Sequence, residues 1–310
     1  MNIVLIAVFQ ASIFSIDGIG EDLSVFRTPF VEVAQKTSIE FAINPEFNIL
    51  NQGGDFRGMF WTNPFSLSIN VPLTKGFTIG AGNLQRIGQS FDGYLEQGDL
   101  GIHLVGKGGI DELYLNVSKS FEVGEIALRG SYLFGNSWEI WDYRMSSYSI
   151  IDTFDYQYHG RSLMGGIRFK LVKLSYEFLA KITSEGSAGD TVIELPERLS
   201  LGLSPALFDG RVDLLFEHSF WHEDKYSSPS RFKIYFAKNN FGIGYTFNPW
   251  YLDHVQEHGL DLSLSAPIKN LGTATFNLSC SFRNKDSLRE FKIIPQVRLT
   301  LKEIFSRRSG

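Results

Sequence analysis

The six histidines are the side chains of this sequence best suited to binding a metal or moving a proton near neutral pH. His218 and His222 lie four residues apart in a segment with strand-like alternation, which places them on one face but about 13 Å apart, too far to share a metal. His254 and His258, in "YLDHVQEHG", would meet only if that loop formed a helical turn. We interpret this segment as a solvated loop and predict no metal site.

Motifs for covalent and phosphate chemistry are also missing from the sequence. There is no Gly-x-Ser-x-Gly elbow and no His-x-Ser-Asn-Gly-like segment of the kind that outer-membrane lipases use. "GKGG" at 106–109 lacks the spacing of a phosphate-binding loop. The single cysteine, Cys280, excludes an intramolecular disulfide and a cysteine-rich zinc site. We therefore predict that the protein is not an enzyme, with no catalytic residues, no metal ligands and no cofactor.

The amino-acid composition further narrows the class of protein. Lys and Arg number 29 against 34 Asp and Glu, with no basic block, so nothing indicates nucleic-acid binding. Aromatic side chains form 14% of the 310 residues, and Phe alone contributes 27, which is heavy for a soluble domain.

Residues 1–16, "MNIVLIAVFQASIFSI", form the one long apolar run of the sequence. The run is too short for a good membrane-spanning helix. We interpret it as a signal peptide, although no Lys or Arg precedes it and no small-x-small cleavage site is clear. A buried N-terminal strand or helix is the alternative.

Alternation of apolar and polar residues with a period of two recurs after about residue 60. In "GLDLSLSAP", for example, three leucines alternate with Asp261 and two serines. Such runs predict an all-β chain of about fourteen antiparallel strands. They lie near residues 37–43, 64–72, 76–85, 110–120, 123–135, 161–170, 171–183, 197–205, 210–222, 230–238, 240–247, 258–267, 271–283 and 289–302. Tight turns such as "EVGE" and "FDG" alternate with longer polar segments at 135–160 and 183–197, which we expect to be loops.

Several features favour a transmembrane β-barrel over a soluble sandwich. Short turns at one end and long loops at the other are typical of such barrels. The predicted strands reach the length of about 9–11 residues that a tilted membrane strand needs. Aromatic residues such as Phe220 and Phe247 stand toward the ends of the apolar stripe, as in an interface girdle. Closure would leave no unpaired backbone edge in lipid.

The alternation also assigns each side chain to a face of the wall. Six apolar residues of 197–222 are predicted to point outward: Leu199, Leu201, Leu203, Val212, Leu214 and Phe216. Their neighbours Ser200, Gly202, Arg211, Asp213 and Glu217 are predicted to point inward. Charged residues in mid-strand are the candidate lining of the lumen: Arg129, Arg168, Lys173, Glu177, Arg211, Asp213, Glu217, Asp261 and Arg298. They would select for a polar or amphipathic solute or form a structural network of paired charges, and both roles can hold together.

The segment "LPERLSLGLSPALFDGRVDLLFEHSFW" resembles part of the FadL-type outer-membrane transporters. The matching positions are Leu195, Pro196, Gly202, Asp213 and Trp221. Downstream, "RFKIYFAKNNFGIGYTFNP" is similar to that family's next hairpin, and the resembling part spans roughly residues 160–305. Upstream, "RTPFVEV" is similar to the family's Asn-Pro-Ala segment only at Pro29.

This resemblance implies a fourteen-stranded barrel whose N-terminal segment plugs the lumen, and passage of hydrophobic compounds such as long-chain fatty acids across an outer membrane. The chain is short for a full fatty-acid transporter, and five residues, "SRRSG", follow Phe305, the aromatic residue that ends the last predicted strand. The same barrel class also includes non-transporting members of secretion machineries. A structural or assembly barrel is therefore the alternative function.

We predict three parts of the chain: a signal peptide at 1–16, a plug at 17–36 and an outer-membrane barrel at 37–305. The plug candidates are Phe26, Arg27, Phe30 and Glu32, with Arg27 or Glu32 meeting wall charges such as Asp213 or Arg211. The expected location is the outer membrane of a diderm bacterium. The expected partners are outer-membrane lipid, a hydrophobic small-molecule ligand or detergent, and the barrel-assembly machinery, but no nucleic acid.

Overall fold

The computed structural model describes residues 21–23, 26–30, 37–52, 54–62, 65–97, 99–145, 148–186, 189–222, 227–251, 255–269, 271–285 and 288–302. Strands form almost all of this structure; one 3-10 turn, η1 (Thr74–Gly76), is the other regular element of the described residues. None of the helical structure described is long and apolar enough to cross a membrane.

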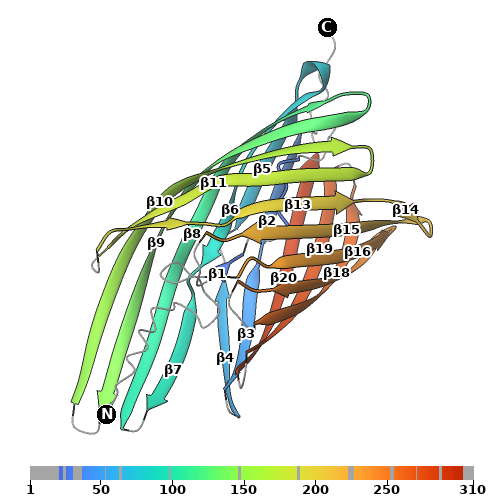
Figure 1. Cartoon of the computed structure of the whole chain (residues 1–310). Helices are drawn as coiled ribbons and strands as arrows, with labels where there is room; N and C mark the ends of the chain where they lie inside the picture. The colour runs from blue at the N-terminus through green and yellow to red at the C-terminus, as the bar shows by residue number, and fades with distance from the viewer. Residues whose placement is uncertain are drawn as a thin grey trace.

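Fourteen antiparallel strands pair into a closed ring, as the sequence predicts (Figure 1). In ring order they are β2 (Ser38–Ile43), β5 (Ser66–Pro72), β6 (Phe77–Gly88), β8 (Leu100–Ser120), β9 (Gly124–Met145), β10 (Tyr148–Phe169), β11 (Val172–Gly186), β13 (Glu197–Leu203), β15 (Gly210–Phe220), β16 (Ser230–Lys238), β17 (Phe241–Pro249), β18 (Gln256–Ile268), β19 (Gly272–Lys285) and β20 (Leu288–Lys302). The ring closes between its first and last strands, where Ser38 pairs with Lys302. The fold is therefore an all-β antiparallel barrel.

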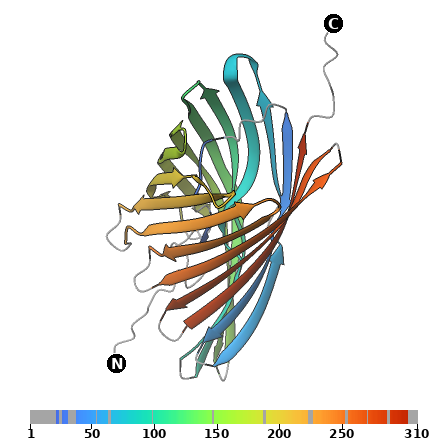
Figure 2. The same ribbon diagram turned by 90° about the vertical axis from the view of Figure 1, so that its right-hand side faces the viewer.

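Six shorter strands attach to this ring: β1 (Glu21–Asp22), β3 (Pro45–Gln52), β4 (Asp55–Thr62), β7 (Phe91–Gln97), β12 (Thr191–Glu194) and β14 (Ala206–Leu207). β20 is long enough to pair with β2 along one half and with β3 along the other. β1 pairs with the end of β6, at Ile87 and Gly88. The β3–β4 and β7–β8 hairpins extend the wall at the end of the barrel far from the C-terminus (Figures 1 and 2).

The prediction of a polar loop at 135–160 is wrong. β9 and β10 continue through it as one ladder, from Phe134 opposite His159 to Met145 opposite Tyr148. A strand ladder is held by backbone hydrogen bonds, so it needs no apolar stripe where it projects beyond the lipid. Of the loop expected at 183–197, residues 183–186 belong to β11 and 191–194 form β12. We name the end with these long hairpins the hairpin end. The opposite end, where the connections at 73–76, 121–123, 170–171, 204–209, 239–240 and 269–271 are short, is the turn end.

The two faces of the wall differ as the alternation predicts. Leu201, Leu203, Leu214 and Phe216 are exposed on the outside. Gly202 and Glu217 are buried, and the flanking Leu199 and Val212 are half-buried. Because cross-strand neighbours such as Leu203 and Leu214 share the outer face, the exposed leucines join into a continuous apolar surface suited to lipid.

The assignment of faces predicts a difference between two adjacent leucines of β15. Leu214→Arg puts a charge on the lipid face near the middle of the strand and should reduce the stability of the protein in bilayers by about 2–4 kcal/mol. Leu215→Arg, which faces the polar interior, should cost clearly less. Urea unfolding in phospholipid vesicles, followed by heat-modifiable migration, measures both. Equal losses at the two positions would contradict the assigned faces.

Candidate functional site

The inward-facing side chains form three layers along the barrel, and β11 crosses all of them. Lys173 and Ser175 line a polar cavity near the turn end. Glu177 is fully buried in a charged layer. Ala180 and Ile182 belong to an apolar cluster nearer the hairpin end.

Four side chains form the centre of the charged layer: Arg27, Arg86, Glu112 and Glu177. Glu177 accepts hydrogen bonds at 2.9 Å from Arg27 and at 2.9 and 3.1 Å from Arg86. Arg27 also pairs with Glu112, and Arg86 lies 3.7 Å from the second oxygen of Glu112. Arg86, Glu112 and Glu177 are at most 1% exposed, and Arg27 is 8% exposed. Each of the two carboxylates is paired with both cations, and Arg129, also buried, interacts electrostatically with Arg27, Glu112 and Glu177. Pairing is the condition under which such buried charges are tolerated.

Arg86 reaches this centre because of an irregularity in β6. Against β8, Gln85 pairs with Asp111 and Ile87 with Ile110, which leaves Arg86 as an extra residue between them. A bulge of this kind redirects a side chain. Here both Arg86 and the following Ile87 are completely buried.

Three further groups of paired charges lie in the interior. Glu217 lies 3.5 Å from Arg231 and accepts a hydrogen bond from Ser200. Elsewhere, Arg283 binds Glu257 at 2.6 Å and Glu290 at 3.1 Å, and its guanidinium lies 4.3 Å from the ring centre of Trp250. Lys292 pairs with Glu46 at 3.0 Å. The interior therefore holds a network of paired, mostly buried charges.

The described residues of 21–30 contact the interior of several wall strands. The Leu23 amide donates to the Arg86 carbonyl at 2.9 Å, and the Phe26 amide donates to Glu217 at 2.9 Å. Arg27 joins Glu112 of β8 and Glu177 of β11. Pro29 and Phe30 lie against Gly166 of β10, where a methyl group at Cα would stand 2.8 Å from each ring.

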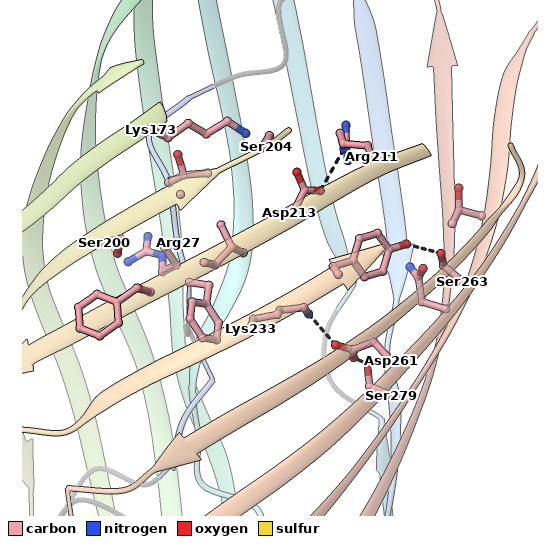
Figure 3. A pocket seen from close by; sticks show the side chains of 18 of the residues that line it. Arg27, Lys173, Ser200, Ser204, Arg211, Asp213, Lys233, Asp261, Ser263 and Ser279 are labelled. Atoms are coloured by element: carbon pink, nitrogen blue, oxygen red, sulfur yellow. Dashed lines mark hydrogen bonds and ion pairs between the residues drawn. The ribbon is translucent and has the colours of Figure 1, made fainter. Parts of the chain in front are cut away.

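The polar cavity encloses about 500 Å³ on the turn-end side of the charged layer (Figure 3). Among its lining residues, Lys233 pairs with Asp261 at 2.6 Å and Arg211 with Asp213 at 3.0 Å. Lys173 extends into it without an ion-pair partner in the described structure. Five cations and two anions line the cavity: Arg27, Lys173, Arg211, Lys233, Arg298, Asp213 and Asp261. A cavity with this lining suits water and polar or anionic groups.

The apolar cluster fills the interior beyond the charged layer. It comprises Ile87, Ile110, Leu133, Tyr158, Ala180, Ile182, Leu195, Trp250, Tyr251 and Val255. The hydroxyl of Tyr158 is held inside it by Gln89 at 2.8 Å and Ser137 at 3.0 Å. These side chains are at most 5% exposed and pack against one another, so this part of the interior is an apolar layer in a lumen whose other layers are polar and charged.

Three solved structures resemble this one in architecture. The first is described as the CymD monoaromatic hydrocarbon channel, with a TM-score of 0.59 and 10% identity over 88% of this chain and 90% of that one. A FadL homologue of Pseudomonas aeruginosa gives 0.60 and 8% over 88% and 91%. The Pseudomonas putida toluene transporter TodX gives 0.54 and 11% over 88% and 92%.

The chain has the FadL-type barrel fold. No family model and no curated protein matches its sequence. At identities this low the likeness of these structures establishes the fold and not the ligand.

Within this FadL-type barrel the nine predicted lumen residues do not form one site. Lys173, Arg211, Asp213, Asp261 and Arg298 line the polar cavity. Glu177 and Glu217 belong to the charged layer. Arg129 is buried and donates to Asn116 at 2.8 Å, and Arg168 pairs with Glu125 nearer the turn end.

The plug candidates differ in what the structure reports. Arg27 contacts Glu112 and Glu177 and does not contact Asp213, which pairs with Arg211. Phe26 and Phe30 lie beside Glu217 and Gly166. Glu32 and the possible metal ligand His254 lie outside the described residues. His258 shares a hydrogen bond of 2.8 Å with Tyr245.

Sequence reasoning missed Arg86, Glu112 and most of the apolar cluster. Arg86 follows directly after the predicted strand 76–85, so its inward direction depends on a bulge that alternation does not reveal. Glu112 was open to prediction, because it alternates with the exposed Leu113 and Leu115. Tyr158 fell within the expected loop 135–160.

The central charges predict unequal effects of two carboxylate-to-amide changes. Glu177→Gln removes one of the two carboxylates that Arg27 and Arg86 share and should destabilise the folded barrel by about 3–5 kcal/mol. Asp213→Asn breaks the more exposed pair with Arg211 and should cost less than about 1 kcal/mol. The midpoint and slope of urea unfolding in vesicles measure both. A Glu177→Gln protein as stable as the Asp213→Asn protein would show that the central charges do not hold the fold.

Proposed function

We propose that this protein is an outer-membrane channel that admits hydrophobic small molecules by diffusion past its N-terminal segment. The observation that carries the proposal is the apolar cluster inside a lumen whose other two layers are polar and charged. The titles of similar structures, a monoaromatic hydrocarbon channel and a toluene transporter, support a ligand of this class at the level of the fold.

The proposed orientation follows from the two ends of the barrel. Short turns face the periplasm in outer-membrane barrels, and longer hairpins face outward. The apolar cluster would then lie on the outer side of the charged layer and the polar cavity on the periplasmic side. A hydrophobic compound entering from outside would meet the apolar cluster before the charges. We propose outer-membrane lipid around the wall and the barrel-assembly machinery as the insertion partner.

The N-terminal segment is the proposed plug, and the contacts of its described residues 26–30 with wall carboxylates of the charged layer support this. Its anchors are Arg27 and the Phe26 amide, both bound to wall carboxylates. Charge-assisted bonds of this kind are strong, yet they can be exchanged for competing partners. Displacement of the segment would open a route between the apolar cluster and the polar cavity.

A second route would lead sideways through the wall. β6 pairs with β5 only as far as Asn83, opposite Leu67, and beyond it β1 supplies a partner at Ile87 and Gly88. The outer edges of β4 and β7 have no further strand partner in the described part of the chain. Because β1 belongs to the N-terminal segment, movement of that segment would uncover the edge of β6.

Two neighbouring glycines of β10 test the plug. Gly166→Leu would collide with Pro29 and Phe30, whereas nothing lies within 4 Å of the corresponding position at Gly165. We expect the Gly166→Leu barrel to leak small sugars in a liposome-swelling assay and the Gly165→Leu barrel to stay closed. Deletion of residues 17–36 should leak at least as fast. A Gly166→Leu barrel and a deletion variant both as tight as wild type would remove the plug from the mechanism.

The ligand class requires a separate test. Cells whose outer membrane carries this protein should take up a neutral aromatic hydrocarbon such as toluene faster than cells without it. Ile182→Gln, within the apolar cluster, should reduce the added uptake about tenfold, equivalent to about 1.4 kcal/mol of lost interaction. Ile167→Gln, on the outer face, is the control. No added uptake, together with no hydrophobic compound in solvent extracts of the purified protein, would favour the structural or assembly barrel.

A further inference from the structure

The turn end of the barrel is basic. The connections between ring strands there, taken with the strand-end residues 119–120, 169, 238 and 268 that precede them, contain five lysines and two acids. The lysines are Lys75, Lys119, Lys170, Lys238 and Lys269, and the acids are Glu122 and Asp209. One contact offsets this charge: Lys238 lies 3.9 Å from Asp209, in an exposed pair. Lys75, Lys170 and Lys269 have no carboxylate partner in the described structure.

The same turns carry exposed apolar side chains. The largest are Leu73, Phe77, Phe121, Val123, Phe169, Leu171, Leu207, Phe208 and Leu271. Phe208 is 82% exposed, at the tip of the β13–β15 connection. Its positive φ of 54° is a conformation that non-glycine residues seldom adopt. A bulky apolar residue in this position gains nothing from packing within the chain.

Lysines and phenylalanines of these turns lie against each other. The Lys119 amine stands 4.4 Å from the ring centre of Phe77 and 5.8 Å from that of Phe121, and it donates to the Lys75 carbonyl. The Lys170 amine stands 5.7 Å from the ring centre of Phe169. Lys119 and Lys170 therefore hold their ammonium groups over aromatic rings. This is the arrangement of a side chain whose stem lies in hydrocarbon and whose ammonium reaches the headgroups.

The hairpin end does not share this character. The β9–β10 hairpin there carries Asp142, Asp152 and Asp155 beside Arg144, and Arg144 is bound to Asp142 at 2.6 Å. Its side chains do not form a comparable set of cations without partners. The contrast between the two ends means that the basic turn end is not a consequence of the overall charge, which is −5.

We propose that the turn end is a docking surface for anionic phospholipid, with the lysine ammonium groups binding headgroup phosphates and the neighbouring phenylalanines entering the acyl-chain boundary. The outer apolar face of the same strands continues directly into these turns, so a bound lipid would keep its chains on the wall while its phosphate meets a lysine. The positive charge of the lysines would attract a phosphate from either source. The apolar outer face beside them and the aromatic rings under the lysine amines also suit acyl chains, which favours a lipid phosphate over a free one. The inference does not depend on what the lumen admits.

Native mass spectrometry of the full chain tests this surface. The protein is equilibrated in detergent with equal amounts of phosphatidylglycerol and phosphatidylcholine that have identical acyl chains, and the lipids retained on the barrel are counted. Wild type should retain phosphatidylglycerol in excess. The excess should fall as salt rises, because exposed charges are screened. A triple variant replaces three of these lysines: Lys75→Gln, Lys119→Gln and Lys170→Gln. For each replaced lysine that holds a lipid, the preference for phosphatidylglycerol should fall about fivefold, equal to about 1 kcal/mol.

Two variants and one competitor separate the possible outcomes. Lysine-to-arginine changes at the same three positions should keep the preference. A second triple variant removes the same charge from strand positions toward the hairpin end: Lys107→Gln, Lys181→Gln and Arg289→Gln. It should also keep the preference for phosphatidylglycerol. Heat-modifiable migration confirms that each variant is folded. Equal retention of both lipids by wild type, an equal loss in the hairpin-end variant, or displacement of the lipid by millimolar inorganic phosphate would overturn the proposal.

Discussion

The pairing of every backbone amide and carbonyl in a wall that meets lipid is the constraint on which this structure depends. Hydrocarbon offers no hydrogen bonds to an open strand edge, so the wall must close. The contact of β2 with β20 accomplishes this closure. Once the ring is closed, alternation assigns each residue to lipid or lumen. Leucines and phenylalanines can then lie outside without cover, which leaves the interior to charged and polar side chains.

The closed ring provides the interior in which the charged layer lies, and it also requires the charges there to be paired. Glu112 and Glu177 lie where water has little access, and they face Arg86 of the wall and Arg27 of the N-terminal segment, with Arg129 close by. Arg27 adds a direct partner for each of the two carboxylates and ties residues 26–30 to β8 and β11. The wall and the N-terminal segment therefore stabilise each other. This mutual dependence also explains why the segment can be held firmly by few contacts: two buried carboxylates lose a charged partner whenever the segment leaves.

The parts of this structure that sequence could predict are those that depend on local pattern. The number of ring strands and the outward direction of Leu201 and Leu214 follow from alternation. The β9–β10 hairpin was missed because its strands lose the alternation that membrane contact imposes, while its backbone ladder continues. The pairing of Arg27 with Glu177 joins residues that lie 150 positions apart, and Arg86 reaches the same carboxylate only through a bulge. No local pattern contains that information, so Asp213 was an equally reasonable partner for Arg27.

The order of the three layers bears on how a channel of this kind would remain selective. Under the proposed function, a hydrophobic compound gains free energy in the apolar cluster and would lose it again among the buried charges, since these are already paired and offer it no interaction. The straight path into the cationic cavity is therefore the costlier one for a neutral solute. The edge of β6, where β1 replaces a wall strand, borders both the apolar cluster through Ile87 and the apolar outer face of the wall. Release of the segment would open this edge to lipid and leave most of the charged layer in place. The charged layer would still close the lumen to polar solutes, and apolar solutes would pass sideways into the membrane.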